Sequence, residues 1–161
     1  PGDEYCYMMG ARTGAGYRQS TARLARFKYQ DVLDKSKYEF WNSSRGMWIQ
    51  GDETKATDVL DGTVGEMSLM YFEQYDRWVA MYFDSAAYAI CYRTAARITG
   101  PWSMEHAICR GSDSRYSQLY GSYIHPACAK KDWGSNEVYW TISLWQPYNV
   151  FLMKAEASFA K

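Results

Sequence analysis

Glu66 is the acidic residue of this sequence that is best placed for acid–base chemistry. It follows a Gly-Thr-Val-Gly segment, predicted to be a turn, and opens an apolar run that is typical of an inner strand. Apolar surroundings would raise the pKa of its carboxyl group into the range of a proton donor. Hydrolysis of a glycosidic bond needs two carboxyl groups, ~5–5.5 Å apart in retaining enzymes and ~6.5–9.5 Å apart in inverting ones. We therefore take Glu66 as a candidate catalytic acid, with a strand-end carboxylate bound to backbone amides as the alternative.

Three predicted turns should lie at the same end of the sheets as this acid, because antiparallel strands return the chain to the end where they began. The turns are Arg12–Gly16, Asp84–Ala87 and Trp145–Asn149. Arg12, Gln146 and Asn149 are candidates for hydrogen bonds to sugar hydroxyl groups. Trp145 or Tyr148 offers an aromatic surface on which a sugar ring can stack. Ordinary turn chemistry is an alternative for each of them, since Gly, Asn and Pro are common in turns anyway.

Tyr120 and His125 flank the strand predicted from the segment Tyr-Gly-Ser-Tyr-Ile-His-Pro. We call the end of the sheets that carries Glu66 and the three turns the rim. We expect Tyr120 near this rim and His125 deeper in a central channel, where the imidazole could bind substrate or help to hold an ion. A buried, hydrogen-bonded structural histidine is the alternative. The other histidine, His106, stands at no metal-ligand spacing, and the four cysteines form no C-x-x-C pair. We therefore predict no metal and no cofactor.

The charges of the chain balance, with 18 Lys and Arg against 18 Asp and Glu. No basic field therefore favours a nucleic-acid partner or an anionic membrane surface. No apolar run approaches the roughly 18–20 residues of a membrane span. The aromatic share of 17% is high, and Tyr and Trp both favour strands and stack on flat ligand faces. The composition indicates a sheet protein without nucleic-acid or membrane partners.

Two weaker features favour a secreted, extracellular protein. Asn42-Ser43-Ser44 is a glycosylation sequon in a polar turn. The chain opens at Pro1 without an apolar leader, as removal of a signal peptide would leave it. In an oxidising compartment Cys109 and Cys128 are the expected disulfide pair, because they precede and follow one predicted inner strand. Such a bridge would stabilise the fold by ~3 kcal/mol.

Short alternating strands separated by turns indicate an all-β meander, with one helical turn within Tyr29–Lys37. The strands group into three units at about residues 4–50, 64–110 and 119–158, and four-strand units that recur at this scale are typical of β-propeller blades. The first unit lacks an inner strand, and the third ends after its third strand. A closed propeller needs at least about four blades. We therefore predict that an N-terminal remainder of the propeller, or a complementary chain, completes the ring.

The order of several segments resembles one protein family over roughly Asp3 to Lys154. The segments are DEYCYMMGARTGAG, TARLARF, LDKSKYEFW, VGEMSLMYFEQYDRWVAMYF, GPW, YGSYIHP and SLWQPYNVFLMK. They are similar to the C-terminal half of a five-bladed propeller family, long classed as a domain of unknown function, that includes endo-D-arabinanases. The resemblance implies a glycoside hydrolase propeller with its active site in the central funnel and an arabinan-type polysaccharide or oligosaccharide as the substrate.

Three functions remain open at this point, because a fold does not fix a function. The first is a secreted glycoside hydrolase that cuts furanosidic links with Glu66 and a second carboxylate on the absent upstream strands. The second is a carbohydrate-binding propeller with the same aromatic rim and no working acid pair. The third is a structural or assembly module, for which a partner chain matters more than the funnel.

Overall fold

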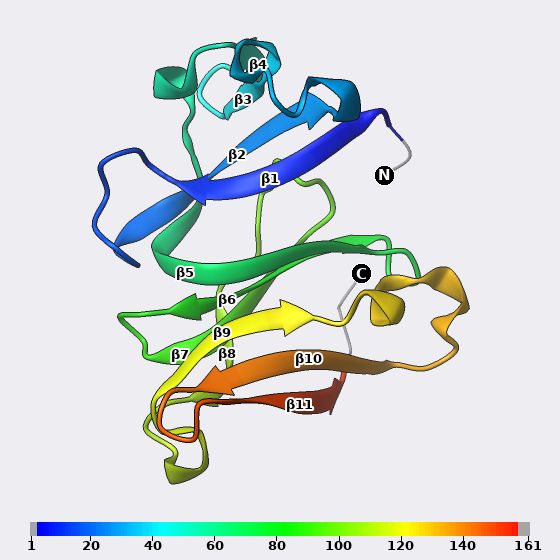
Figure 1. The fold of residues 1–161 in the computed structure, drawn as a ribbon. Coiled ribbons are helices and arrows are strands. Elements are labelled where there is room, and N and C mark those ends of the chain that lie inside the picture. The colour runs from blue at the N-terminus through cyan, green and yellow to red at the C-terminus, as the bar shows by residue number, and fades with distance from the viewer. Residues whose placement is uncertain (1–2, 158–161) are drawn as a thin grey trace.

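The computed structural model describes residues 3–157, and every long element in it is a β-strand. Eleven strands form two antiparallel sheets, joined by loops that carry short 3₁₀ turns (Figure 1). Two of these turns, Tyr29–Asp31 and Lys35–Lys37, confirm the helical turn expected there. Among the described residues, no helix has the length and apolar character needed to cross a membrane. The predicted all-β fold of consecutive antiparallel strands is confirmed.

The larger sheet contains eight strands. They are β1 (Tyr5–Ala11), β2 (Ser20–Lys28), β3 (Glu39–Asn42), β4 (Met47–Gln50), β5 (Asp58–Phe72), β6 (Arg77–Asp84), β7 (Ala89–Ala95) and β8 (His106–Arg110). Their order is β4-β3-β2-β5-β6-β7-β8, and β1 pairs with β2 beside this path. The sheet therefore has β1 and β4 as free edges at one end and β8 at the other.

β5 joins the two halves of the larger sheet. Its first half pairs with β2 and its second half with β6, and the register with β6 is interrupted between Val64 and Met67. The predicted Gly-Thr-Val-Gly turn is therefore wrong, because these residues belong to a strand that has partners on both sides. Gly65 fits this bulge, since a Cβ there would stand 3.0 Å from the carbonyl oxygen of Phe83. Glu66 thus lies at a bulge inside a long strand and not at a strand start.

The smaller sheet has three strands in the order β11-β10-β9. They are β9 (Leu119–Ile124), β10 (Glu137–Leu144) and β11 (Asn149–Glu156). β9 packs against β5 and β6, and Figure 1 shows β1, β5 and β9 following one another down one side of the molecule. Phe83 and Ile90 of the larger sheet share a buried core with Trp140 and Ile142 of the smaller one. The division into three blades stays a prediction, and residue 158 of the third unit lies outside the described residues.

Cys109 and Cys128 lie in this core as free thiols, so the predicted disulfide between them is wrong. Cys128 lies in the 3₁₀ turn Pro126–Ala129, and its Sγ accepts a hydrogen bond from the Tyr139 amide of β10 at 3.1 Å. Burial raises the pKa of the Cys109 thiol, which keeps the thiol protonated and unreactive. Packing and hydrogen bonds therefore hold this region together without a covalent bridge.

Asn42 does not have the accessible position expected of a glycan carrier. Its side chain is buried at the end of β3, where Nδ2 donates to the Lys55 carbonyl at 2.6 Å. Its Oδ1 accepts a hydrogen bond from the Arg45 amide at 2.9 Å. A glycan on Nδ2 would disrupt the first of these bonds. The Asn42 side chain therefore stabilises the turn, and the triplet lends no support to secretion.

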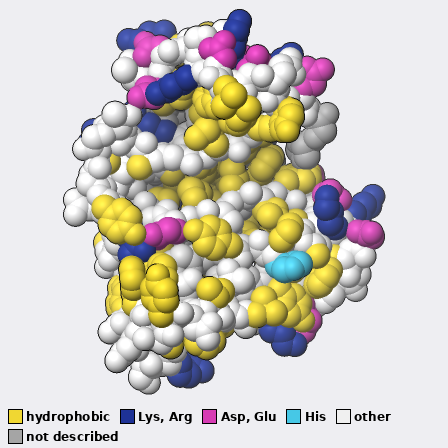
Figure 2. All heavy atoms as spheres, viewed as in Figure 1, with side chains coloured by type: hydrophobic (Ala, Val, Ile, Leu, Met, Phe, Trp, Pro, Cys, Tyr) yellow, Lys and Arg dark blue, Asp and Glu magenta, His cyan; other side chains and the backbone are white. Residues whose placement is uncertain are grey.

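Two sheet faces at opposite ends of the arrangement expose apolar side chains. On the first, β1, β2 and β3 line a hollow of about 600 Å³ whose walls include Met8, Ala25 and Phe40. On the second, Val150 and Leu152 of the edge strand β11 are exposed. Figure 2 shows hydrophobic side chains across the face formed by β1, β5 and β9, which is hollowed between β1 and β5. Apolar faces and bare strand edges of this kind are typical of surfaces that another element covers.

Candidate functional site

Glu66 lies where the loop between β1 and β2 reaches over the bulge of β5. Its Oε1 accepts hydrogen bonds from Arg18 Nη2 at 2.5 Å, from Arg18 Nε at 3.1 Å and from the Tyr17 hydroxyl at 2.8 Å. Its Oε2 is buried and has no hydrogen-bond partner among residues 3–157. The carboxylate is thus held through one oxygen, and the acceptor capacity of the other is unused.

The pKa of Glu66 is lowered, which corrects the expectation of a raised one. Burial is the largest single influence and by itself would raise the pKa of this carboxyl group. Hydrogen bonds from Arg18, from the backbone amide of Glu66 and from Tyr17 lower the pKa, and together they outweigh burial. Glu66 is therefore a carboxylate at neutral pH, suited to act as a base, a nucleophile or an electrostatic partner but not as a proton donor.

Arg18 ties three segments of the chain together at this site. Its φ of 54° lies in the left-handed region, where surrounding contacts must hold a bulky residue in place. Its guanidinium carbon lies 4.7 Å from the ring centroid of Tyr17, 4.8 Å from that of Phe83 and 5.9 Å from that of Tyr120. The Ser85 hydroxyl donates to the Arg18 carbonyl at 2.6 Å. Arg18 thereby connects the β1–β2 loop with the β6–β7 turn and with β9.

Exposed aromatic rings continue from Arg18 across this rim. Tyr120 stacks on Trp145 with ring centroids 4.8 Å apart, and the Trp145 ring lies 6.0 Å from that of Tyr148. Tyr17, Trp145 and Tyr148 are 75%, 53% and 77% exposed. Rings that are this open to solvent and are connected through Arg18 and Tyr120 present apolar faces to a ligand.

The β10–β11 turn carries the other polar candidates predicted for the rim. Gln146 and Asn149 are both exposed next to the stacked rings. Asn149 Oδ1 accepts a hydrogen bond from the Val150 amide at 2.8 Å, which is the turn chemistry considered as the alternative. The side-chain NH₂ groups of both residues are chemically suited to donate to sugar hydroxyl groups.

His125 has a capping role instead of a place deep in a channel. It is exposed just after β9, and its Nδ1 accepts a hydrogen bond from the Ala127 amide at 3.3 Å. This bond caps the 3₁₀ turn Pro126–Ala129, which begins at the proline that ends the strand. The structural alternative for His125 is therefore supported in its hydrogen bond and wrong in its burial, because the side chain is exposed. Residues 3–157 contain no group of three or more potential metal ligands.

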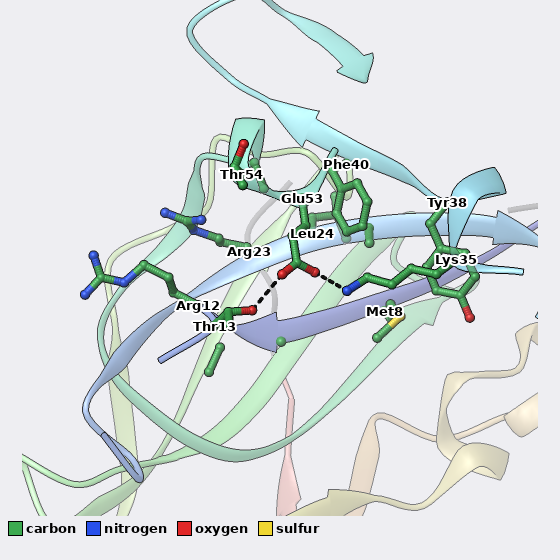
Figure 3. Close-up of a pocket in the computed structure, with 14 residues that line it drawn as sticks. Met8, Arg12, Thr13, Arg23, Leu24, Lys35, Tyr38, Phe40, Glu53 and Thr54 are labelled. Atoms are coloured by element: carbon green, nitrogen blue, oxygen red, sulfur yellow. Dashed lines mark hydrogen bonds and ion pairs between the residues drawn. The ribbon is translucent and has the colours of Figure 1, made fainter. Parts of the chain in front are cut away.

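Arg12 lies at the edge of the hollow on the first sheet face. Figure 3 shows Arg12 and Arg23 at one end of this hollow and Glu53 bound across it. Thr13 Oγ1 donates to Glu53 Oε1 at 2.7 Å, and Lys35 Nζ lies 2.5 Å from Glu53 Oε2. The same loop thus sends Arg12 to the hollow and Arg18 to the carboxylate of β5.

Tyr17 and Arg18 are the site residues that sequence reasoning missed. The predicted turn ends at Gly16, and the aromatic–cation pair follows it directly. The antiparallel order of the strands brings this loop to the rim. An aromatic residue followed by an arginine, directly after a glycine-rich loop, was therefore the sequence signal that could have identified Tyr17 and Arg18. The loop geometry that bends Arg18 onto Glu66 depends on tertiary contacts.

The two antiparallel sheets and their shared rim belong to an all-β propeller, the class predicted from the sequence. The chain is a member of the family described as a domain of unknown function, DUF4185, which matches residues 1–154. No curated protein matches it.

Similar folds occur among solved structures. One is a protein from Bacteroides ovatus assigned provisionally as a hydrolase, with 15% sequence identity and a TM-score of 0.58. That similarity covers 92% of this chain and 39% of the other, so this chain spans about two fifths of its length. A second is an exo-β-1,3-galactanase from Phanerochaete chrysosporium with bound β-1,3-galactotriose. It has 11% sequence identity and a TM-score of 0.39, and the similarity covers 94% of this chain and 32% of the other. This similarity is distant. These similarities bear on the fold alone, and the blade number stays a prediction.

Proposed function

We propose that this protein is a carbohydrate-active propeller that cleaves glycosidic bonds at the rim around Glu66. One observation carries the proposal: the Glu66 carboxylate, whose pKa is lowered by its hydrogen bonds, lies 2.5 Å from Arg18, which also contacts the series of rings from Tyr17 to Tyr148. Aromatic faces bind the apolar sides of ligands, and a carboxylate beside them is one half of the pair that glycosidases use.

The substrate that we propose is a furanosidic, arabinan-type polysaccharide. Its support is the resemblance of the sequence to endo-D-arabinanases, whereas the geometry itself favours only a ligand with flat apolar faces. We further propose that the protein acts outside the cell, where a hydrolase of such polymers would meet them.

Glu66 is the ionised member of the catalytic pair in this proposal. Its lowered pKa suits a base that activates water or a nucleophile that attacks the sugar, and not the acid that protonates the leaving group. The proton donor would then be a second carboxyl group on strands outside this chain. The separation of the two groups would decide between inversion and retention.

We propose that additional propeller strands cover the two apolar sheet faces. Met8 and Phe40 line the open hollow on the first face, and Val150 and Leu152 are exposed on the second. An N-terminal remainder of the same protein is the occupant we favour, because the chain spans 39% of the similar structure from Bacteroides ovatus. A complementary chain is the alternative, and five blades are what the sequence resemblance implies.

Carbohydrate binding without hydrolysis is the second candidate function. Arg18 neutralises the Glu66 carboxylate, and Oε2 is buried. Such a pair is well suited to hold sugar hydroxyl groups in place, whereas a nucleophile needs an accessible oxygen. A structural or assembly module is a third candidate, and the open apolar faces favour it.

Release of oligosaccharides from a panel of arabinans by the intact protein tests these candidates. We expect release, together with quenching of tryptophan fluorescence when soluble arabinan binds near Trp145. Quenching without release would favour the binding function. Neither signal from any arabinan would contradict the proposal and favour the structural module.

A further inference from the structure

Four hairpins of this protein are closed by loops of the same length. The loops are residues 43–46, 73–76, 85–88 and 145–148. In each loop the fourth residue has a positive φ: 63° at Gly46, 51° at Asp76, 48° at Tyr88 and 49° at Tyr148. The same backbone conformation is therefore used four times, with very different side chains at its left-handed position.

The type of residue at the fourth loop position differs between hairpins at the Glu66 rim and hairpins elsewhere. Gly46 closes the β3–β4 hairpin at the outer edge of the larger sheet, and Asp76 closes the β5–β6 hairpin at the end of those strands away from Glu66. Glycine and aspartate both accept the left-handed region readily. Tyr88 and Tyr148 close the two hairpins at the Glu66 rim, although a bulky aromatic residue is unfavourable in this conformation.

Packing among residues 3–157 does not account for Tyr148. Its side chain is 77% exposed, and its ring centroid lies 6.0 Å from that of Trp145 in a tilted arrangement. A ring that stays mostly in water gains little from burial, so its unfavourable backbone conformation is not offset by a core contact. Whatever offsets this conformation therefore lies outside residues 3–157.

Tyr88 packs against the protein on one side of its ring and is 39% exposed to solvent. Its ring packs on Gly111, where a Cβ would stand 2.2 Å from Tyr88 Cε1, and meets the Phe83 ring edge-to-face at 6.1 Å. The Arg18 guanidinium lies 4.8 Å from that same Phe83 ring. Tyr88 thus belongs to the series of contacts that runs through Arg18 to the other rings of the rim.

We propose that Tyr88 and Tyr148 are stacking surfaces for sugar rings at the two ends of this series, with the Glu66 carboxylate between them. The ligand is then an oligosaccharide segment of several units, because Arg18, Tyr120 and Trp145 lie between the two tyrosines in the series. The inference rests on the proposed function and extends it by naming where distant units of the ligand bind.

The test measures thermal stability and binding of soluble arabinan in the same full-chain variants. Asparagine tolerates a positive φ, so Tyr148→Asn should raise Tm by about 2–4 °C. The same variant should bind arabinan roughly tenfold more weakly, because it loses one stacking surface. Tyr88→Asn should weaken binding to a similar degree, without the rise in Tm, because it also loses the packing on Gly111.

Gly46→Tyr is the matched control. A Cβ at this position meets no atom within 4 Å, so the substitution introduces the unfavourable conformation without a clash at Cβ. It should lower Tm by about as much as Tyr148→Asn raises it, with arabinan binding unchanged. A Tyr148→Asn variant that binds arabinan like the parent, or melts at a lower temperature, would overturn the inference and leave the proposed function standing. A parent protein that binds no arabinan would overturn both.

Discussion

Two arginine–glutamate pairs of this protein share the same chemistry in different backbone settings. Arg26 and Glu39 face each other across the regular pairing of β2 with β3, and their side chains form an ion pair. Arg18 and Glu66 meet instead between a loop residue of positive φ and a strand bulge. The two pairs are similarly buried, with side-chain exposures of 20% and 23% against 16% and 26%. Burial therefore does not distinguish them.

The aromatic surroundings of the two pairs differ more. The Arg26 guanidinium lies 4.0 Å from the Tyr5 ring centroid and 4.3 Å from that of Trp48. Tyr7 fills the space between Trp48 and Trp78, at 6.1 and 5.9 Å, so these half-buried rings pack on one another. The rings near Arg18 include several that are mostly exposed. The same kind of ion pair can therefore stabilise strand pairing where the surrounding rings are packed, and can form part of a candidate site where the surrounding rings face solvent.

The largest expected effect on stability is at the packed cluster. Trp78→Ala removes a ring that contacts Tyr7 at 5.9 Å and Tyr71 at 5.4 Å, and should lower the free energy of unfolding by about 3 kcal/mol. Urea unfolding measures this loss, and arabinan binding per folded molecule should stay at the parent value. An unchanged unfolding midpoint would show that this cluster does not fasten the strands.

The matching substitution at the rim should act on binding instead. Trp145→Ala removes an exposed ring that stacks on Tyr120, so arabinan binding should weaken roughly tenfold. The free energy of unfolding should stay within about 0.5 kcal/mol of the parent, as for most surface substitutions. Titration calorimetry and urea unfolding check the two halves of this prediction. Strong destabilisation with intact binding would reverse the comparison.

A smaller effect concerns the pH dependence of stability. The folded-state pKa of Glu66 lies below the ordinary value of 4.5, so its ionised form stabilises the fold above the unfolded-state pKa. This contribution is lost as pH falls through the lowered folded-state pKa. The difference in unfolding free energy between parent and Glu66→Gln should therefore be largest near neutral pH and should shrink as pH falls through the lowered pKa of Glu66. A difference that grows on acidification would mean that the pKa is raised.

The smallest expected effect is that of reducing agents. Cys6, Cys91, Cys109 and Cys128 are all free, so a reductant should leave Tm unchanged. All four thiols should react with a thiol reagent after denaturation. A lower Tm in the presence of reductant would restore the disulfide between Cys109 and Cys128 that the sequence suggested.

Much of the fold could be predicted from the sequence, because alternation and turn residues are local signals. They located most strands and brought the turn at Trp145 to the same rim as Tyr120. These local signals failed at β5. Its two glycines are typical of a turn in the sequence, but they lie in a strand that pairs with β2 and β6 and contains a bulge. The choice between turn and bulge depends on neighbouring strands that are distant in sequence.

The electrostatics of the site could not be predicted from the sequence. The apolar run near Glu66 suggested a raised pKa, and burial does act in that direction. The opposing hydrogen bonds come from Tyr17 and Arg18, which lie 49 and 48 residues away in the chain. A pKa depends on which partners reach a group in space, and spacing along the chain does not reveal them.

The arabinan-hydrolysing activities of Glu66→Gln and Glu39→Gln, compared at equal concentrations of folded protein, show whether Glu66 is a catalytic carboxylate. We predict the larger loss in Glu66→Gln. Both changes remove the negative charge from an arginine–glutamate pair and keep the shape of the side chain. Glu66→Gln should lower oligosaccharide release by ~10²–10⁴-fold, whereas Glu39→Gln should keep most of the parent activity. Thermal melting of both variants provides the folding control. A Glu66→Gln protein that retains most of the activity, or equal losses in the two variants, would contradict the account.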